Sequence, residues 1–106
     1  MLDIKNREFR SNIELFTNIA VLKQLVAEVD EAISQNKNVP GATRDLKFVR
    51  NRLKQELDRN MNRIVKDRQK DVLENIDKML YGVEDLDQIK TLARQKMMLG
   101  AELDYH

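Results

Sequence analysis

The chain contains only one proline and three glycines, and their positions constrain its fold more than any other feature. Pro40 and Gly41 are adjacent, and the other two glycines are Gly82 and Gly100. Because both residue types are unfavourable inside helices and favoured at helix ends, they divide the chain into three segments. The middle segment, residues 43–81, contains neither residue type, and apolar residues recur at a helical period in all three segments.

The first segment predicts a helix over about residues 3–36. One apolar stripe has alternating spacings of four and three, which are typical of packed helices: Leu15, Ile19, Leu22, Val26, Val29 and Ile33. A second stripe occupies only the first half of the segment: Leu2, Phe9, Ile13, Phe16 and Ala20. The first half of this helix is therefore expected to contact two neighbours, and the second half only one.

The second segment predicts a helix over about residues 43–81, with Thr43 as the N-cap and Gly82 as the C-cap. Its apolar stripe begins at Leu46 and drifts around the helix by roughly 90° in all, and a left-handed supercoil gives about 20° per heptad. Arg68 also interrupts the stripe. A break near residues 66–70, which would give two helices, is therefore the alternative.

The third segment predicts a helix from about residue 85 to residue 99, or to 103 if it continues through Gly100. Asp85 and Gln88 form a capping pattern at its start. A short turn makes the first two helices antiparallel neighbours, so the third must fold back from the open end of the pair. We predict that it places Leu86, Ile89 and Ala93 against Phe9, Ile13 and Phe16.

The sequence thus predicts a single all-α domain over residues 1–106. Its fold would be a long antiparallel helical hairpin, packed like a coiled coil, with a shorter third helix over its open half. Val21, Leu25 and Phe48 lie outside the main stripes in the half that this helix would leave uncovered. Single exposed apolar residues are ordinary, but a contiguous patch indicates an interface. The two interpretations have similar weight, and the second predicts a homodimer or a larger closed assembly.

Charge is unevenly distributed, although the net charge is only +1. Residues 44–70 contain ten basic and four acidic residues, whereas residues 71–90 contain six acidic residues and two lysines. On a continuous helix five of the basic residues would form a ridge over about 27 Å: Arg52, Arg59, Arg63, Lys66 and Lys70. This ridge is a candidate contact for a protein partner or for the phosphates of a nucleic acid. A solvated face, or one that pairs with the acidic region of another copy, is the simpler interpretation because no aromatic residues alternate with the basic ones.

The composition argues against an enzyme. The single histidine is His106, cysteine is absent, and the glycines do not cluster into a phosphate-binding loop. The acidic pairs Asp67/Asp71 and Glu74/Asp77 share helix faces, but such pairs are usually solvated. We therefore expect no catalytic residues, no metal, no cofactor and no small-molecule substrate.

The prediction for function is a non-enzymatic helical interaction or assembly protein, such as an adaptor, scaffold or inhibitor. It would act through its surface on protein partners, with self-association favoured. A nucleic-acid-binding or regulatory protein that uses the basic ridge is the alternative. The beginning of the sequence does not resemble a signal peptide, and the longest apolar run, residues 19–22, is too short to span a membrane. We therefore expect a cytoplasmic protein without a membrane partner.

Overall fold

The structure, a computed structural model, describes the backbone of residues 13–105 and the side chains of residues 13–98. The described residues form four helices and contain no strand: α2 (Ile13–Gln35), α3 (Pro40–Met61), α4 (Lys66–Leu80) and α5 (Leu86–Tyr105). The predicted all-helical class is therefore confirmed. The predicted start of the first helix near residue 3, and its apolar residues Leu2 and Phe9, lie outside the described residues.

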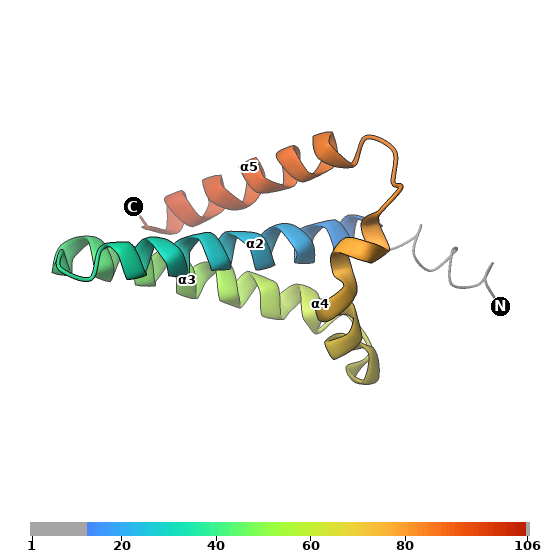
Figure 1. Cartoon of the computed structure of the whole chain (residues 1–106), viewed down its shortest axis with the longest axis horizontal. Coiled ribbons are helices and arrows are strands. Elements are labelled where there is room, and N and C mark those ends of the chain that lie inside the picture. The colour runs from blue at the N-terminus through green and yellow to red at the C-terminus, as the bar shows by residue number, and fades with distance from the viewer. Residues whose placement is uncertain (1–12, 106) are drawn as a thin grey trace.

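Helices α2 and α3 lie side by side and run in opposite directions (Figure 1), joined by a turn over residues 36–39. The Nδ2 of Asn36 donates a hydrogen bond of 2.7 Å to the carbonyl of Ala32 at the end of α2. The Oγ1 of Thr43 donates one of 2.7 Å to the carbonyl of Asn36. The prediction of Thr43 as the N-cap is wrong, because α3 begins at Pro40, whose fixed φ suits the first turn of a helix.

The predicted continuous helix over residues 43–81 is wrong. Helix α3 ends at Met61 and α4 begins at Lys66, so the chain turns at residues 62–65, just before residues 66–70, where the alternative places a break. Asn60 and Asn62 flank the end of α3, and asparagine favours helix ends because its amide competes for backbone hydrogen bonds. Two hydrogen bonds of 3.0 Å hold the corner, both donated by the Nε2 of Gln69, to the carbonyls of Met61 and Ile64.

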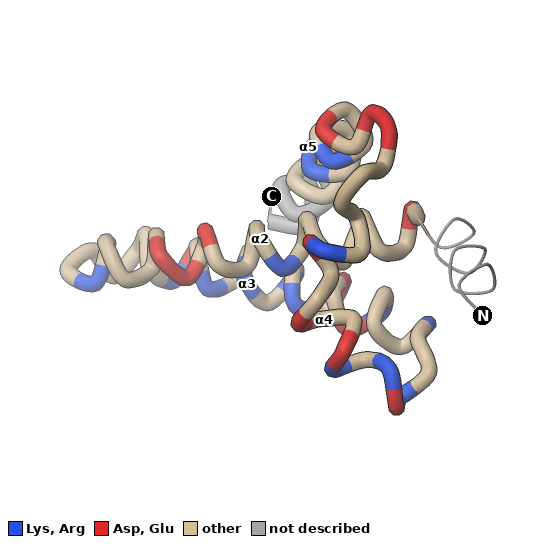
Figure 2. The backbone as a smooth tube through the Cα atoms, turned by 45° about the vertical axis from the view of Figure 1, so that its right-hand side comes forward, with Lys and Arg blue, Asp and Glu red and all other residues tan. Residues whose placement is uncertain are grey.

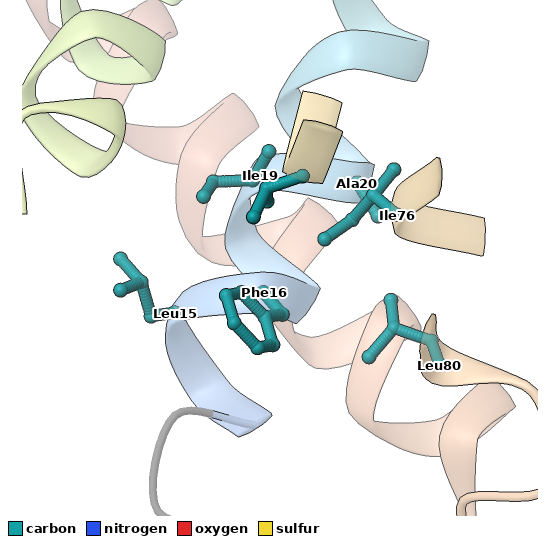
Figure 3. Close-up of a cluster of buried hydrophobic side chains, with 7 residues drawn as sticks. Leu15, Phe16, Ile19, Ala20, Ile76 and Leu80 are labelled. Carbon is teal, nitrogen blue, oxygen red and sulfur yellow. The ribbon is translucent and has the colours of Figure 1, made fainter. Parts of the chain in front are cut away.

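The turn allows α4 to pack against the first half of α2. Figure 3 shows the resulting cluster, in which Leu15, Phe16, Ile19 and Ala20 of α2 contact Val72, Ile76 and Leu80 of α4. A hydrogen bond of 2.8 Å, from the Nζ of Lys23 to the carbonyl of Leu73, joins the same two helices. The first half of α2 therefore has two neighbours, as its double stripe requires, but one of them is α4.

Helix α5 runs back along α2 and α3 (Figure 1). It follows Gly82, whose φ of 85° confirms its predicted role in ending the preceding helix. The helix continues through Gly100 to Tyr105, beyond both predicted ends. Its Arg94 forms an ion pair with Glu28 of α2, with 2.9 Å between Nη2 and Oε1.

A second cluster lies further along α2, where Val21, Leu22 and Leu25 contact Leu53 of α3. The side chains of α5 that pack against this cluster are Ala93, Met97 and Met98. The predicted contact between Ala93 and Phe16 is therefore wrong. Of the apolar side chains of α5 that the structure describes, Leu86 at its start packs against the cluster that contains Phe16.

Candidate interaction surface

Val21 and Leu25, predicted at an oligomer interface, lie in the core. Val21 is 2% exposed and Leu25 is 3% exposed, because α5 covers both within the same chain. This prediction is wrong for a physical reason: α4 occupies the first half of α2, so α5 packs over the half that was expected to be uncovered. Phe48 differs from these two residues, since it is 43% exposed on α3.

The five residues of the predicted basic ridge do not lie on one helix. Arg52 and Arg59 lie on α3, Arg63 lies in the turn, and Lys66 and Lys70 lie on α4. Helix α4 does not continue the direction of α3 (Figure 2). The ridge as a single straight track of about 27 Å is therefore wrong, because it depended on a helix that continues through residues 62–65.

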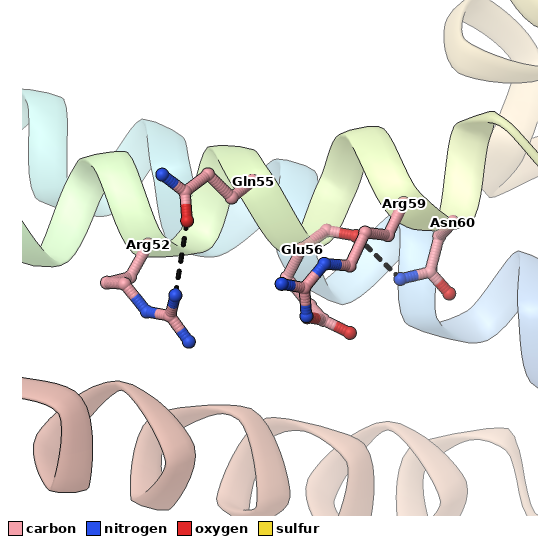
Figure 4. Close-up of polar contacts among 5 residues, drawn as sticks. All are labelled: Arg52, Gln55, Glu56, Arg59 and Asn60. Carbon is pink, nitrogen blue, oxygen red and sulfur yellow. Dashed lines mark hydrogen bonds and ion pairs between the residues drawn. The ribbon is translucent and has the colours of Figure 1, made fainter.

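Two of these arginines are engaged on α3 itself. Figure 4 shows Arg52 and Arg59 on the side of α3 that faces α5. The Nη1 of Arg52 donates a hydrogen bond of 3.1 Å to Oε1 of Gln55. The Nη1 of Arg59 lies 3.2 Å from Oε2 of Glu56. Both arginines therefore contribute to the organisation of α3 as well as to its charge.

The basic excess of residues 44–70 nevertheless lies on the outside of the molecule. The half-buried charges in this stretch cancel, since Arg50 and Arg52 are matched in number by Asp45 and Glu56. The exposed acidic residues are Asp58 and Asp67. The exposed basic residues, which we call the basic surface, are Arg44, Lys47, Lys54, Arg59, Arg63, Lys66, Arg68 and Lys70.

The exposed charges that follow in the chain have the opposite sign. In residues 71–98 the exposed basic residues are Lys78 and Lys96. The exposed acidic residues, which we call the acidic surface, are Asp71, Glu74, Asp77, Glu84, Asp85 and Asp87. Figure 2 shows that basic residues at the start of α4 give way to acidic residues further along this helix. Sequence reasoning identified the acidic stretch but selected none of its residues as a site. The available signal was that Glu74 and Asp77 share one face of a helix.

The described residues contain no group of three or more histidine or acidic side chains that could hold a metal ion. Over the same part of the chain, no helix combines the length and the apolar character that crossing a bilayer requires.

Comparisons of the chain with protein-family models, with curated proteins and with solved structures found no match in any of the three.

Proposed function

We propose that the protein is a non-enzymatic helical interaction protein that associates with protein partners, a second copy of itself among them, through its exposed charges. The observation that carries the proposal is the separation of these charges into a basic and an acidic surface on one chain. In residues 44–70 the exposed basic residues outnumber the exposed acidic ones by eight to two, and in residues 71–98 the exposed acidic residues outnumber the basic ones by six to two.

Contacts within the chain leave most of these charges unused. Two ion pairs between helices join Arg50 to Asp30 at 3.3 Å and Arg94 to Glu28 at 2.9 Å, and both acids belong to α2. Neither the lysines of the basic surface nor Glu74 and Asp77 form an ion pair among the described residues. Because the net charge of the chain is only +1, two copies can approach without strong overall repulsion.

In this proposal the α2–α3 pair is the scaffold, an antiparallel hairpin with coiled-coil-like packing. The spacing of four and three along α2 supports that packing. The scaffold positions α4, the connection after it and the start of α5, which together carry the acidic surface. The lack of cysteine, and the presence of a single histidine at the last position of the sequence, support a role without catalysis.

We expect the protein to self-associate at low ionic strength and to dissociate as salt is added, because salt screens exposed charges. Sedimentation equilibrium at pH 7, where the net charge of the chain is near zero, would measure this at about 0.05 M and about 0.5 M salt. A monomer at every concentration at low salt would contradict the proposal. Association that strengthens with salt would contradict it as well, since it would indicate an apolar interface.

The alternative function is nucleic-acid binding, which the outward excess of basic residues favours. Loss of the straight ridge removes the single track along one helix, but Lys66 and Lys70 remain exposed beside Arg63. Labelled duplex DNA or RNA, titrated with the protein at low salt, distinguishes the two functions. Binding that weakens steeply with salt would support the alternative.

A further inference from the structure

Helix α4 is where the basic surface meets the acidic surface. Four exposed residues of α4, and Tyr81 directly after its end, are separated by four, four, three and four positions, so the four helical residues share one face of the helix. We call this set the α4 outer face: Lys66, Lys70, Glu74, Asp77 and Tyr81. The charge along it changes sign once, from two lysines to two acids. All five side chains are exposed, and Figure 2 shows the backbone of α4 extending away from the α2–α3 pair.

The ion pairs of the described residues do not account for this order of charges, because none of the four charged side chains of the α4 outer face forms one. The helix dipole does not account for it either. Lys66 and Asp77 oppose the dipole, whereas Asp67 and Lys78 in the same two turns have the arrangement that the dipole favours. An oppositely charged face on a second molecule would stabilise this order.

We propose that this partner is a second copy of the chain, with the two α4 helices packed antiparallel. The twofold axis passes between the two outer faces at the level of Val72 along the helix. In this register Lys70 faces Glu74 of the second copy, and Lys66 faces Asp77 of the second copy. The symmetry repeats each pair, so all four charged residues of each face are used. A parallel arrangement would instead oppose like charges along the whole face.

The residues beside this face fit the same register. Asp67 and Lys78 are both exposed and lie on one flank of the α4 outer face. About a twofold axis near Val72, Asp67 of one copy faces Lys78 of the other. Tyr81, which is 89% exposed, comes close to Arg63 of the second copy, where its ring can contact the guanidinium. A closed pair with one twofold axis is also the commonest form of homo-oligomer.

This inference rests on the proposed function, and charge reversal tests it separately. One variant carries Lys66→Glu with Lys70→Glu, and its α4 outer face is entirely acidic. Another carries Glu74→Lys with Asp77→Lys, and its α4 outer face is entirely basic. We expect each variant alone to self-associate about tenfold or more weakly than the wild type, because reversal removes the attraction of the exposed pairs and replaces it with repulsion. An equimolar mixture of the two should form a heterodimer, and a variant with all four reversals should self-associate as the wild type does.

The matched control is Lys47→Glu with Lys54→Glu, which reverses two exposed lysines of the basic surface on α3. It should leave self-association unchanged, and circular dichroism should show that all variants retain their helices. If the wild type associates but the α4 reversals have no effect, or if the mixture fails to associate, the α4 pairing is wrong while the proposed function stands. A wild type that does not associate at low salt removes both.

Discussion

Replacing Val21 by aspartate should largely unfold the protein. Val21 lies on α2 and is 2% exposed. It belongs to the apolar cluster against which Met97 and Met98 of α5 pack. A carboxyl group placed there has no charged partner, so we expect the free energy of unfolding to fall by about 4 kcal/mol or more. That loss is comparable to the whole stability of many domains. Urea denaturation followed by circular dichroism would measure it.

The control for Val21→Asp is Phe48→Asp, which introduces the same charge at a residue that is 43% exposed on α3. We expect it to change the free energy of unfolding by about 1 kcal/mol or less. Both positions were predicted from sequence to belong to one interface. A Val21→Asp protein that keeps its stability and changes only its oligomeric state would show that the interface prediction was correct and that α5 does not cover Val21.

Replacing Leu80 by alanine should lower the free energy of unfolding by about 2–5 kcal/mol, because it leaves a cavity where α4 packs against α2. Leu80 is 0% exposed, in the cluster that contains Phe16 and Ile19. The matched control is Leu92→Ala, the same chemical change at a residue that is 59% exposed on α5. Its expected effect is about 0.5 kcal/mol or less. Equal losses in urea denaturation would show that Leu80 does not occupy the core.

Much of the local structure could be predicted from the sequence, because glycine, proline and helical period act locally. The apolar stripe of α2 correctly predicted Leu15, Ile19 and Leu22 as core residues, and Gly82 ends a helix as expected. The order of the charges along the chain was also readable. These features depend on neighbouring residues and require no knowledge of how the helices pack.

The position of the turn was harder to predict, because residues 62–65 contain neither glycine nor proline. The available signal was Arg68, which interrupts the apolar stripe, since a drift of roughly 90° is about what 20° per heptad gives over residues 46–79. The turn lets Val72, Ile76 and Leu80 face α2. The side chain that holds the corner, Gln69, acts through the carbonyls of Met61 and Ile64, and sequence spacing does not reveal such contacts.

The errors at the candidate surface followed from this one turn. With a continuous second helix, the third could cover only the open half of the pair, which left Val21 and Leu25 without a neighbour. With the turn, α4 fills that half and α5 covers Val21 and Leu25. The turn also divides the predicted ridge and places its last two lysines, Lys66 and Lys70, at the start of α4.

A distance between α2 and α4 tests the turn at residues 62–65 most directly. Because the chain has no cysteine, spin labels can be attached at Gln24→Cys and Glu74→Cys alone. Both residues are exposed, and each follows a partner in the hydrogen bond between Lys23 and the carbonyl of Leu73. Measurement at about 0.5 M salt suppresses contributions from paired copies.

We predict a distance of roughly 20 Å or less between the labels, because the backbone segments that carry them are in contact through Lys23. A continuous second helix gives a different result. The pair between Arg50 and Asp30 sets the register of α2 and α3, and it would place Gln24 opposite Glu56. Glu74 would then lie about 27 Å further along the helix axis. A label distance near 30 Å would therefore contradict the turn, and with it the position of α4.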